Sequence, residues 1–460
     1  MTEPITPVST PPVREGLTHR LFRAARWTLV GYASTQILRL GSNLILARLL
    51  APEMFGVIAV GHVVIAGLRM FSDVGLGAGI IRSHRGDDPQ FLNVVWLVQI
   101  ARGGLITLSG LAFSGGLILA MRYGLLPAHS VYADPLIPKV VALLSLSGLV
   151  SGFDSTKIWT ARRQLAFAKL TKIELGSQIA TTIFILAWAK VAPSIWALAF
   201  GWLFSASLMM TLTHLALPGV TNRFEWDRTA FREIFDFGKW TFVSSALSFL
   251  LNSGDRLLMA GFLSSTMMGL YSIAFELVNA LQAAVVRLVG YTVLPALSEV
   301  ARERPEQLKR TLYRVRIPLD IACVVTAGML TILGPSIVAV LYDKRYAEVG
   351  WMLSVLATTL LATRLDVFDQ CLLAMGRPKL LSVLNGVRLV ALYAIMPSGY
   401  LLFGVEGAVA AVAFSALLNS VAVLTLQGHL RLLDIRRELL ALPLYALGLL
   451  AGWAVRSILM

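Results

Sequence analysis

The stretches ARLLAPEMFGVIA at residues 47–59 and AGFLSSTMMGLYS at residues 260–272 look like copies of each other. At a constant offset of 213 residues, the identities are Ala47 with Ala260, Leu50 with Leu263, Met54 with Met267 and Gly56 with Gly269. Each stretch ends one apolar segment and begins the next. A repeat that spans about half the chain predicts a duplicated helical membrane bundle, and transporters built this way bind substrate at the interface of the repeats.

The composition also indicates a membrane protein. Of the 460 residues, 57% are hydrophobic and 14% are charged, and the mean hydropathy is +0.73. Runs of about 20 apolar residues match the thickness of the hydrocarbon core, which helices can cross. We therefore expect an all-α polytopic membrane protein. Cys323 and Cys371 both lie in apolar segments, so we do not expect a metal site built on them. We also expect no cofactor.

Thirteen apolar segments are candidate membrane spans. They lie near residues 27–48, 55–78, 92–120, 137–155, 172–190, 194–216, 238–260, 268–297, 317–341, 350–375, 380–403, 406–428 and 439–458. Lys and Arg favour cytoplasmic loops, and most of the 40 basic residues fall in such loops if the N-terminus is inside. The net charge of +14 therefore reports topology and contact with anionic lipid headgroups. It does not indicate a nucleic-acid partner, because no basic soluble surface exists.

These spans predict five regions. Residues 1–24 are polar and proline-rich and should form a disordered cytoplasmic tail. Two lobes of six helices each should follow, an N-lobe over 25–220 and a C-lobe over 238–430. Residues 221–237 alternate aromatic and charged residues, which predicts a short cytoplasmic helix lying in the membrane interface between the lobes. Residues 431–460 should form an extra C-terminal transmembrane segment.

Two equivalent spans carry polar stripes. The first has Tyr32, Gln36, Arg39 and Asn43 on one helical face, and the seventh has Ser245, Ser248, Asn252 and Arg256. Because the two spans correspond in the repeat, we expect the stripes to face each other across a central cavity. The alternative is that these side chains tie helices together by hydrogen bonds.

Other charges inside spans are candidate functional groups, because burying a charge at a helix centre costs at least ~2.5–3.5 kcal/mol. The basic ones are all arginine, and arginine stays charged and binds phosphate with two parallel hydrogen bonds. We therefore expect a cationic cavity for an anionic headgroup, to which Arg102, Arg287, Arg364 and Arg388 would contribute. The candidates for ion coupling are Asp73, Asp255, Glu276 and Asp366. For some, structural roles are open: an Arg69–Asp73 ion pair at i,i+4, or snorkelling of Arg364 and Arg388.

The sequence lacks the motifs of ATP-binding proteins and of several classes of enzyme. No GxxxxGK[ST] phosphate-binding loop occurs, and no credible Ser/His/Asp or metal constellation does, so we do not expect an enzyme. The GLGAG at 75–79 lacks the strand context of a dinucleotide turn and is interpreted as close helix packing or a flexible helix end.

The chain resembles the polysaccharide-transporter branch of the multidrug/oligosaccharidyl-lipid/polysaccharide (MOP) exporter superfamily. The matching stretches are RLGSNLILARLLAPEMFGVIAV (39–60), FSDVGLGAGIIR (71–82), ARRQLAFAKLTKIELGSQ (161–178), residues 235–279 and LLAMGRPKLLSVLNGVRL (372–389). The resemblance implies two six-helix lobes related by a pseudo-twofold axis, about 12–14 transmembrane helices, and a V-shaped cationic cavity in the bacterial inner membrane.

The resemblance also implies a function. An undecaprenyl-pyrophosphate-linked oligosaccharide would move from the cytoplasmic to the periplasmic leaflet by alternating access, for exopolysaccharide or O-antigen-type biosynthesis. By resemblance, Arg39, Arg102 and Arg256 would bind pyrophosphate or acidic sugars. Membrane lipids and a polysaccharide polymerase or export machinery would be partners.

Three alternatives are open. A cation-coupled multidrug antiporter of the same superfamily would need an acidic, aromatic-lined cavity. A lipid II flippase is a close sibling of the main hypothesis. A glycan polymerase or ligase would need a large outside loop with clustered carboxylates or histidines, whereas the longest one, 121–136, offers only Asp134 and His129.

Overall fold

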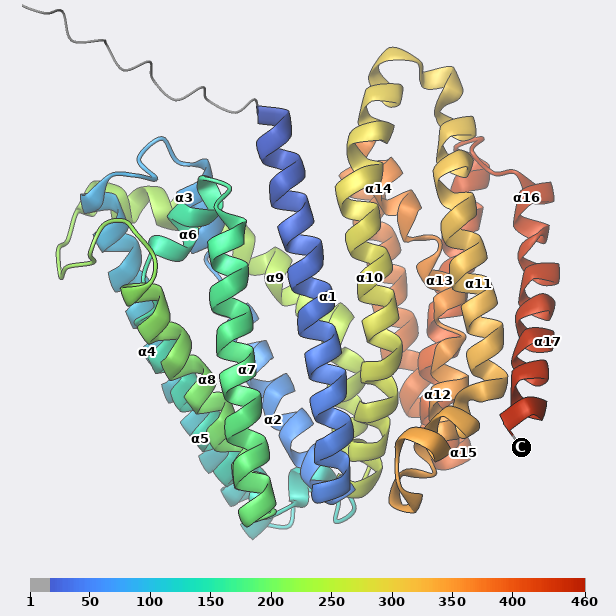
Figure 1. Ribbon diagram of the computed structural model, residues 1–460, viewed down its shortest axis with the longest axis horizontal. Helices are drawn as coiled ribbons and strands as arrows, with labels where there is room; N and C mark the ends of the chain where they lie inside the picture. Colours follow the sequence, from blue (N-terminus) through green and yellow to red (C-terminus); the bar gives the residue numbers. More distant parts are fainter. Residues whose placement is uncertain (1–16, 460) are drawn as a thin grey trace, which may run out of the picture.

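The computed structural model describes residues 17–459, which form α-helices and short 3-10 turns and no strand (Figure 1). The helices of the first half are α1 (Leu17–Leu49), α2 (Pro52–Met70), α3 (Leu76–Arg82), α4 (Pro89–Arg122), α5 (Leu136–Gly152), α6 (Lys157–Arg163), α7 (Phe167–Val191) and α8 (Ile195–Leu215). Those of the second are α9 (Arg228–Phe262), α10 (Ser265–Glu303), α11 (Leu308–Leu341), α12 (Val349–Ala357), α13 (Leu360–Thr363), α14 (Asp366–Ala374), α15 (Pro378–His429), α16 (Ile435–Leu439) and α17 (Ala441–Leu459).

Helices occupy the core of every predicted span. Within the described part of the chain, nine helical segments are long and apolar enough to cross a membrane, and the bent α5–α6 pair makes a tenth. Helices α1 and α9 have the length but are less apolar, because they carry the polar stripes. Helix α15 holds two predicted spans, which meet where Gly404 adopts a φ of 63°. The prediction of an all-α multi-pass membrane protein is confirmed.

Two predicted boundaries are wrong. Helix α1 already begins at Leu17, because residues 17–24 contain neither proline nor glycine to stop it, so the tail prediction fails there. Residues 1–16 of the predicted tail lie outside the described residues. The interfacial helix expected over 221–237 is not a separate element, since Asp227 caps a helix that runs unbroken from Arg228 to Phe262.

The two bundles stand side by side, with α1 and α9 between them (Figure 1). Across the divide, α2 and α10 approach most closely. A Cβ atom on Gly56 would lie 1.9 Å from the carbonyl oxygen of Ser265, and one on Gly269 would lie 1.9 Å from that of Pro52. Both glycines and both carbonyl partners are separated by the repeat offset. The contact is therefore reciprocal, as a pseudo-twofold axis requires.

The largest hydrophobic cluster is shared by the two lobes. The largest buried cluster combines Leu50 and Val131 with Leu263 and Tyr346, all near the end of the bundle where α1 and α9 terminate. At the opposite end, each lobe has clusters of its own. One joins α10, α11 and α14, a second lies in the N-lobe, and a third joins α3 and α4 to Ala230 and Ile234 at the start of α9.

Helix α9 crosses from one bundle to the other (Figure 1). Its N-terminal part packs on the N-lobe as far as Phe249, which covers Gly67, and Ser245 donates a hydrogen bond to Asp73 at 2.9 Å. Its C-terminal part packs on α15, where Phe262 stacks on Tyr400 at 4.8 Å between ring centroids. The α9 N-terminus is also tied to the loop before α4, and hydrogen bonds from Thr229 and Arg85 lower the pKa of Asp227 to about 2.

The GLGAG segment is a packing element, as interpreted. Gly75 adopts a φ of 64° at the start of α3, a conformation that glycine tolerates. Gly77 lies against the Trp159 ring of α6, where a Cβ atom would come within 2.3 Å. Helices α5 and α6 meet at 65°. The Gln99 side chain donates hydrogen bonds to the carbonyls that this break exposes, those of Ser151, Gly152 and Asp154.

Candidate functional site

A polar cavity of 490 Å³ lies within the C-lobe. Helices α9, α10, α12–α15 and the turns between them line it. Its polar and charged residues include Asn252, Ser253, Asp255, Arg256, Asn279, Gln282, Thr359, Thr363, Asp366, Asp369, Asn385, Arg388, Ser415, Asn419 and Ser420. Among the lining residues that the structure describes, Phe275 is the only aromatic side chain. A wall of amides, hydroxyls and a few charges suits a ligand with many hydroxyl groups.

Arg256 is held in place by its neighbours. Its Nη2 donates to the Asn252 carbonyl and to the Ser253 hydroxyl, both at 3.0 Å, and its guanidinium lies 4.6 Å from the centroid of the Phe275 ring. Asp255 approaches Arg256 Nε at 3.9 Å and accepts a 2.7 Å hydrogen bond from Tyr271. A guanidinium fixed this way presents its remaining donors to the cavity with little loss of side-chain entropy.

Two aspartates of α14 share the cavity with Arg388 of α15. Asp366 and Asp369 are three residues apart, so they lie on one face of the helix. Neither makes a hydrogen bond or ion pair within the described residues. Of the four predicted ion-coupling candidates, the structure brings Asp255 and Asp366 to this cavity. Asp73 and Glu276 lie elsewhere.

The α1 stripe faces a different part of the molecule. Arg39 forms a 3.3 Å ion pair with Glu276 of α10, and Tyr32 donates to the Ala280 carbonyl at 3.2 Å. Arg287 lies 3.8 Å from the centroid of the Tyr32 ring. The same face carries the half-buried Gln36 and Asn43. The two stripes thus reach neighbouring residues of α10, Phe275 and Glu276, instead of facing each other across this cavity.

Two other predicted cavity arginines are engaged in packing. Arg102 donates to the Arg69 carbonyl at 2.6 Å and to Ser72 at 3.2 Å, and it approaches Asp73 at 3.9 Å. The Arg69–Asp73 ion pair does not form, because α2 ends at Met70 and Asp73 lies beyond the helix. Arg69 instead contacts Ser147 and Ser151 of α5, each at 3.4 Å.

Arg364 belongs to a buried cluster of charges and does not snorkel. It lies 3.0 Å from Glu438 and 3.6 Å from Asp320. Arg316, which has no solvent exposure, bonds both of these carboxylates. The cluster joins α11 and the α13–α14 turn to α16, and so fastens the extra C-terminal segment. Helix α17 then packs on α11, with Gly328 and Gly448 at backbone contact.

The cavity therefore carries two arginines and three aspartates, and the arginine excess of the spans does not gather in it. Charge alone does not predict its amides, Asn279, Gln282, Asn385 and Asn419. Uncharged amides inside spans were the available signal. Gln282, for example, donates to Thr359 at 2.9 Å and to Thr363 at 3.1 Å across the broken α12–α13 segment.

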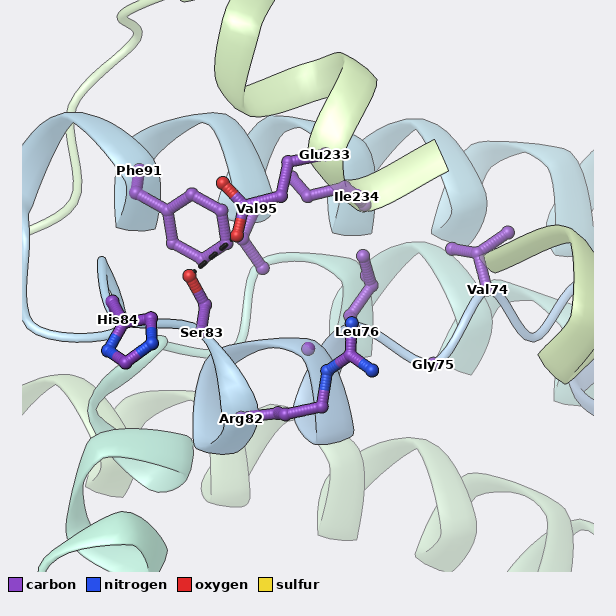
Figure 2. Close-up of a pocket in the computed structure, with 11 residues that line it drawn as sticks. Val74, Gly75, Leu76, Arg82, Ser83, His84, Phe91, Val95, Glu233 and Ile234 are labelled. Atoms are coloured by element: carbon purple, nitrogen blue, oxygen red, sulfur yellow. Dashed lines mark hydrogen bonds between the residues drawn. The ribbon is translucent and has the colours of Figure 1, made fainter. Parts of the chain in front are cut away.

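A second cavity, of 360 Å³, lies where α9 meets the N-lobe (Figure 2). Val74, Leu76, Arg82, His84, Phe91 and Ile234 are among its lining residues. Across it, Ser83 donates a 2.6 Å hydrogen bond to Glu233 of α9 (Figure 2). None of the predicted site residues lines this cavity.

Known proteins share this sequence and fold. The family described as "Polysaccharide biosynthesis protein" matches residues 45–367. A candidate O-antigen transporter of Shigella flexneri is 25% identical over 66% of this chain and 73% of its own. The teichuronic acid biosynthesis protein TuaB of Bacillus subtilis is 22% identical over 79% of this chain and 73% of its own.

Among solved structures, the lipid II flippase MurJ in an inward closed conformation aligns with a TM-score of 0.64 at 13% identity, covering 94% of this chain and 99% of its own. An inward-facing multidrug resistance MATE transporter aligns with a TM-score of 0.63 at 14% identity, covering 88% and 98%. The fold is that of a multi-pass membrane transporter of the MOP superfamily. The chain belongs to the polysaccharide biosynthesis protein family.

Proposed function

We propose that the protein is a flippase for a lipid-linked oligosaccharide, moving its headgroup from the cytoplasmic to the periplasmic leaflet of the bacterial inner membrane by alternating access. The observation that carries the proposal is the C-lobe cavity, whose amides and hydroxyls suit sugar hydroxyl groups and whose Arg256 and Arg388 suit an acidic group. The family match and the O-antigen transporter relative support it.

The carrier would be undecaprenyl pyrophosphate, with its polyprenyl chain in the bilayer and its headgroup in the cavity. The bias of Lys and Arg toward one set of loops supports a cytoplasmic N-terminus. In that orientation the shared core closes the periplasmic end. The return of the empty protein to its inward-facing state would use a proton or Na⁺, and Asp255 and Asp366 are the candidate binding groups inside the cavity. Asp73 and Glu276 are weaker candidates because they lie outside it.

A cation-coupled multidrug antiporter is the second candidate. It is favoured by the three aspartates of the cavity, which outnumber the two arginines. It is disfavoured by the single aromatic side chain, since an apolar cation gains most from stacking on several rings.

The test is mass spectrometry of lipid-linked glycans in a strain lacking the protein, complemented with wild-type protein, Arg256→Ala or Arg388→Ala. We expect an undecaprenyl-pyrophosphate oligosaccharide to accumulate and surface polysaccharide to be lost, with rescue by the wild type only. Arg122→Ala is the matched control, because Arg122 is exposed at the end of α4.

Rescue by Arg122→Ala together with failure of the cavity variants would assign the headgroup to the C-lobe cavity. A normal pool of lipid-linked glycans, with new sensitivity to cationic drugs, would replace the flippase by the antiporter.

A further inference from the structure

We infer that the two lobes are fastened together at the closed end by two equivalent latches, each a short 3-10 turn of one lobe that hydrogen-bonds the carbonyl end of the first helix of the other lobe. The proposed function supplies only the orientation of this end toward the periplasm. The latches themselves follow from contacts in two turns, Val131–Ala133 and Lys344–Tyr346.

The C-lobe latch grips α1. The Arg345 guanidinium donates from Nη2 to the carbonyls of Ala47 and Arg48, at 3.2 and 3.3 Å. The buried Tyr346 donates from its hydroxyl to the Leu50 carbonyl at 3.0 Å. The last carbonyls of a helix have no partner within the helix and carry its negative dipole end, so a fixed guanidinium is a favourable cap. Asp343 positions that guanidinium by accepting hydrogen bonds from Arg345 Nε at 3.1 Å and from Nη2 at 2.6 Å.

The N-lobe latch grips α9 in the same way. The Val131 amide donates to the Leu263 carbonyl at 2.9 Å, and the Tyr132 hydroxyl donates to the Leu257 carbonyl at 3.1 Å. Asp134, which follows the turn, accepts a 2.6 Å hydrogen bond from Ser265 at the start of α10.

The repeat relates the two latches. Leu50 and Leu263, each an acceptor at the end of its helix, are equivalent at the offset of 213 residues, and Tyr132 and Tyr346 are one residue from that offset. The reciprocal contact of Gly56 and Gly269 lies on the same two helices, α2 and α10, that follow the gripped ends. The acceptor Leu50, the donor Tyr346 and both Val131 and Leu263 belong to the largest buried cluster, which combines residues of both lobes. The latches therefore hold the interface that must separate when the periplasmic end opens.

The two latches differ in one respect that makes the inference testable. The C-lobe latch depends on a charged side chain, whereas the N-lobe latch uses a backbone amide and a phenol. Arg345→Gln therefore weakens one latch without touching the other. If the lobes separate as units, weakening one latch must also expose the other.

Ala47 and Ala260 are equivalent, buried reporters of the two latches. Each would be replaced by cysteine in a chain with Cys323→Ala and Cys371→Ala. Right-side-out vesicles would be treated with a membrane-impermeant maleimide. With Arg345→Gln we expect labelling of both reporters to accelerate, by roughly three- to tenfold, because hydrogen bonds from a charged donor are lost. Lys344→Gln is the matched control, since it removes an exposed charge from the same turn.

An unchanged labelling rate, or an increase confined to the Ala47 reporter, would overturn the inference. Tyr346→Phe, which removes a single oxygen atom, provides the same comparison if Arg345→Gln does not fold. The labelling needs no substrate, so its outcome is separate from that of the glycan assay. If the labelling results match the expectation but a strain lacking the protein has normal lipid-linked glycans, the flippase proposal would be refuted and the latches would remain supported.

Discussion

Gly56 shows how the absence of one side chain sets the distance between the lobes. In Gly56→Ala, the new methyl group would overlap the Ser265 carbonyl, which is backbone and cannot rotate away. We expect a destabilisation of about 1–3 kcal/mol, the usual cost of overpacking, seen as a lower unfolding midpoint in detergent. Gly104→Ala, in α4 with nothing within 4 Å of the new atom, is the control and should be neutral or slightly stabilising. Equal effects of the two substitutions would contradict the contact.

Glycan transport should depend on the shape of the Arg256 side chain as well as on its charge. Lysine cannot donate to the Asn252 carbonyl and Ser253 while keeping a flat face on Phe275. In Arg256→Lys we therefore expect glycan transport to fall about tenfold, the effect of losing one hydrogen bond to a charged group. Recovery of surface polysaccharide after induction measures the rate. Recovery of surface polysaccharide at the wild-type rate in Arg256→Lys would mean that transport depends only on the charge of this residue.

The sequence predicted some side chains of the site better than others, for a physical reason. Arg256, Asn252 and Asp366 were predicted and do line the cavity. Arg364 was predicted to line it but is neutralised by Glu438, a residue 74 positions away on a helix that no local spacing could place nearby. Periodicity gives the face of a helix, whereas the partner of that face depends on tertiary packing.

Among the helices, the extra C-terminal segment is the clearest case of attachment by charge. Glu438 on α16 bonds both Arg316 and Arg364, so Glu438→Gln leaves two buried guanidinium groups with less compensation. Breaking such a pair costs about 3–5 kcal/mol. We expect a much lower unfolding midpoint and early proteolytic loss of α17. Glu306→Gln, at an exposed site, is the control, and matching midpoints for the two variants would refute the role of the cluster.

The helices themselves were largely predictable, because long apolar runs can hardly be anything else. Their ends were less so. Helix α2 ends at Met70, several apolar residues before the predicted end, and α9 begins at Arg228 instead of after a separate interfacial helix. In both places a local hydrogen bond determines the boundary. Asp73 accepts from the Gly75 amide at 3.0 Å, and Asp227 accepts from the Thr229 amide at 2.9 Å.

For the molecule as a whole, the closed end should be insensitive to ordinary changes of pH. The hydrogen bond from Arg345 lowers the pKa of Asp343, so this carboxylate stabilises the folded state above its unfolded pKa of about 3.9 and loses that effect only as pH falls further. Arg48 and Glu53 also act electrostatically on this pair, Arg48 on Asp343 and Glu53 on Arg345. We expect equal maleimide labelling of the Ala47 reporter at pH 6 and pH 8, after correction for thiol reactivity. A marked difference would assign the latch to another titrating group.

The crossing of α9 has a practical consequence. The copied unit begins with this helix, yet the helix packs on the first bundle as far as Phe249 and on α15 from Gly254. The repeat unit in the sequence therefore begins at the start of α9, whereas the boundary between the two packed bundles falls within α9. Chimeras that exchange halves between related transporters should therefore be joined within α9, between Phe249 and Gly254. With a junction in the loop before α9, the whole of α9 would come from one parent, while the N-lobe surface on which its first part packs would come from the other.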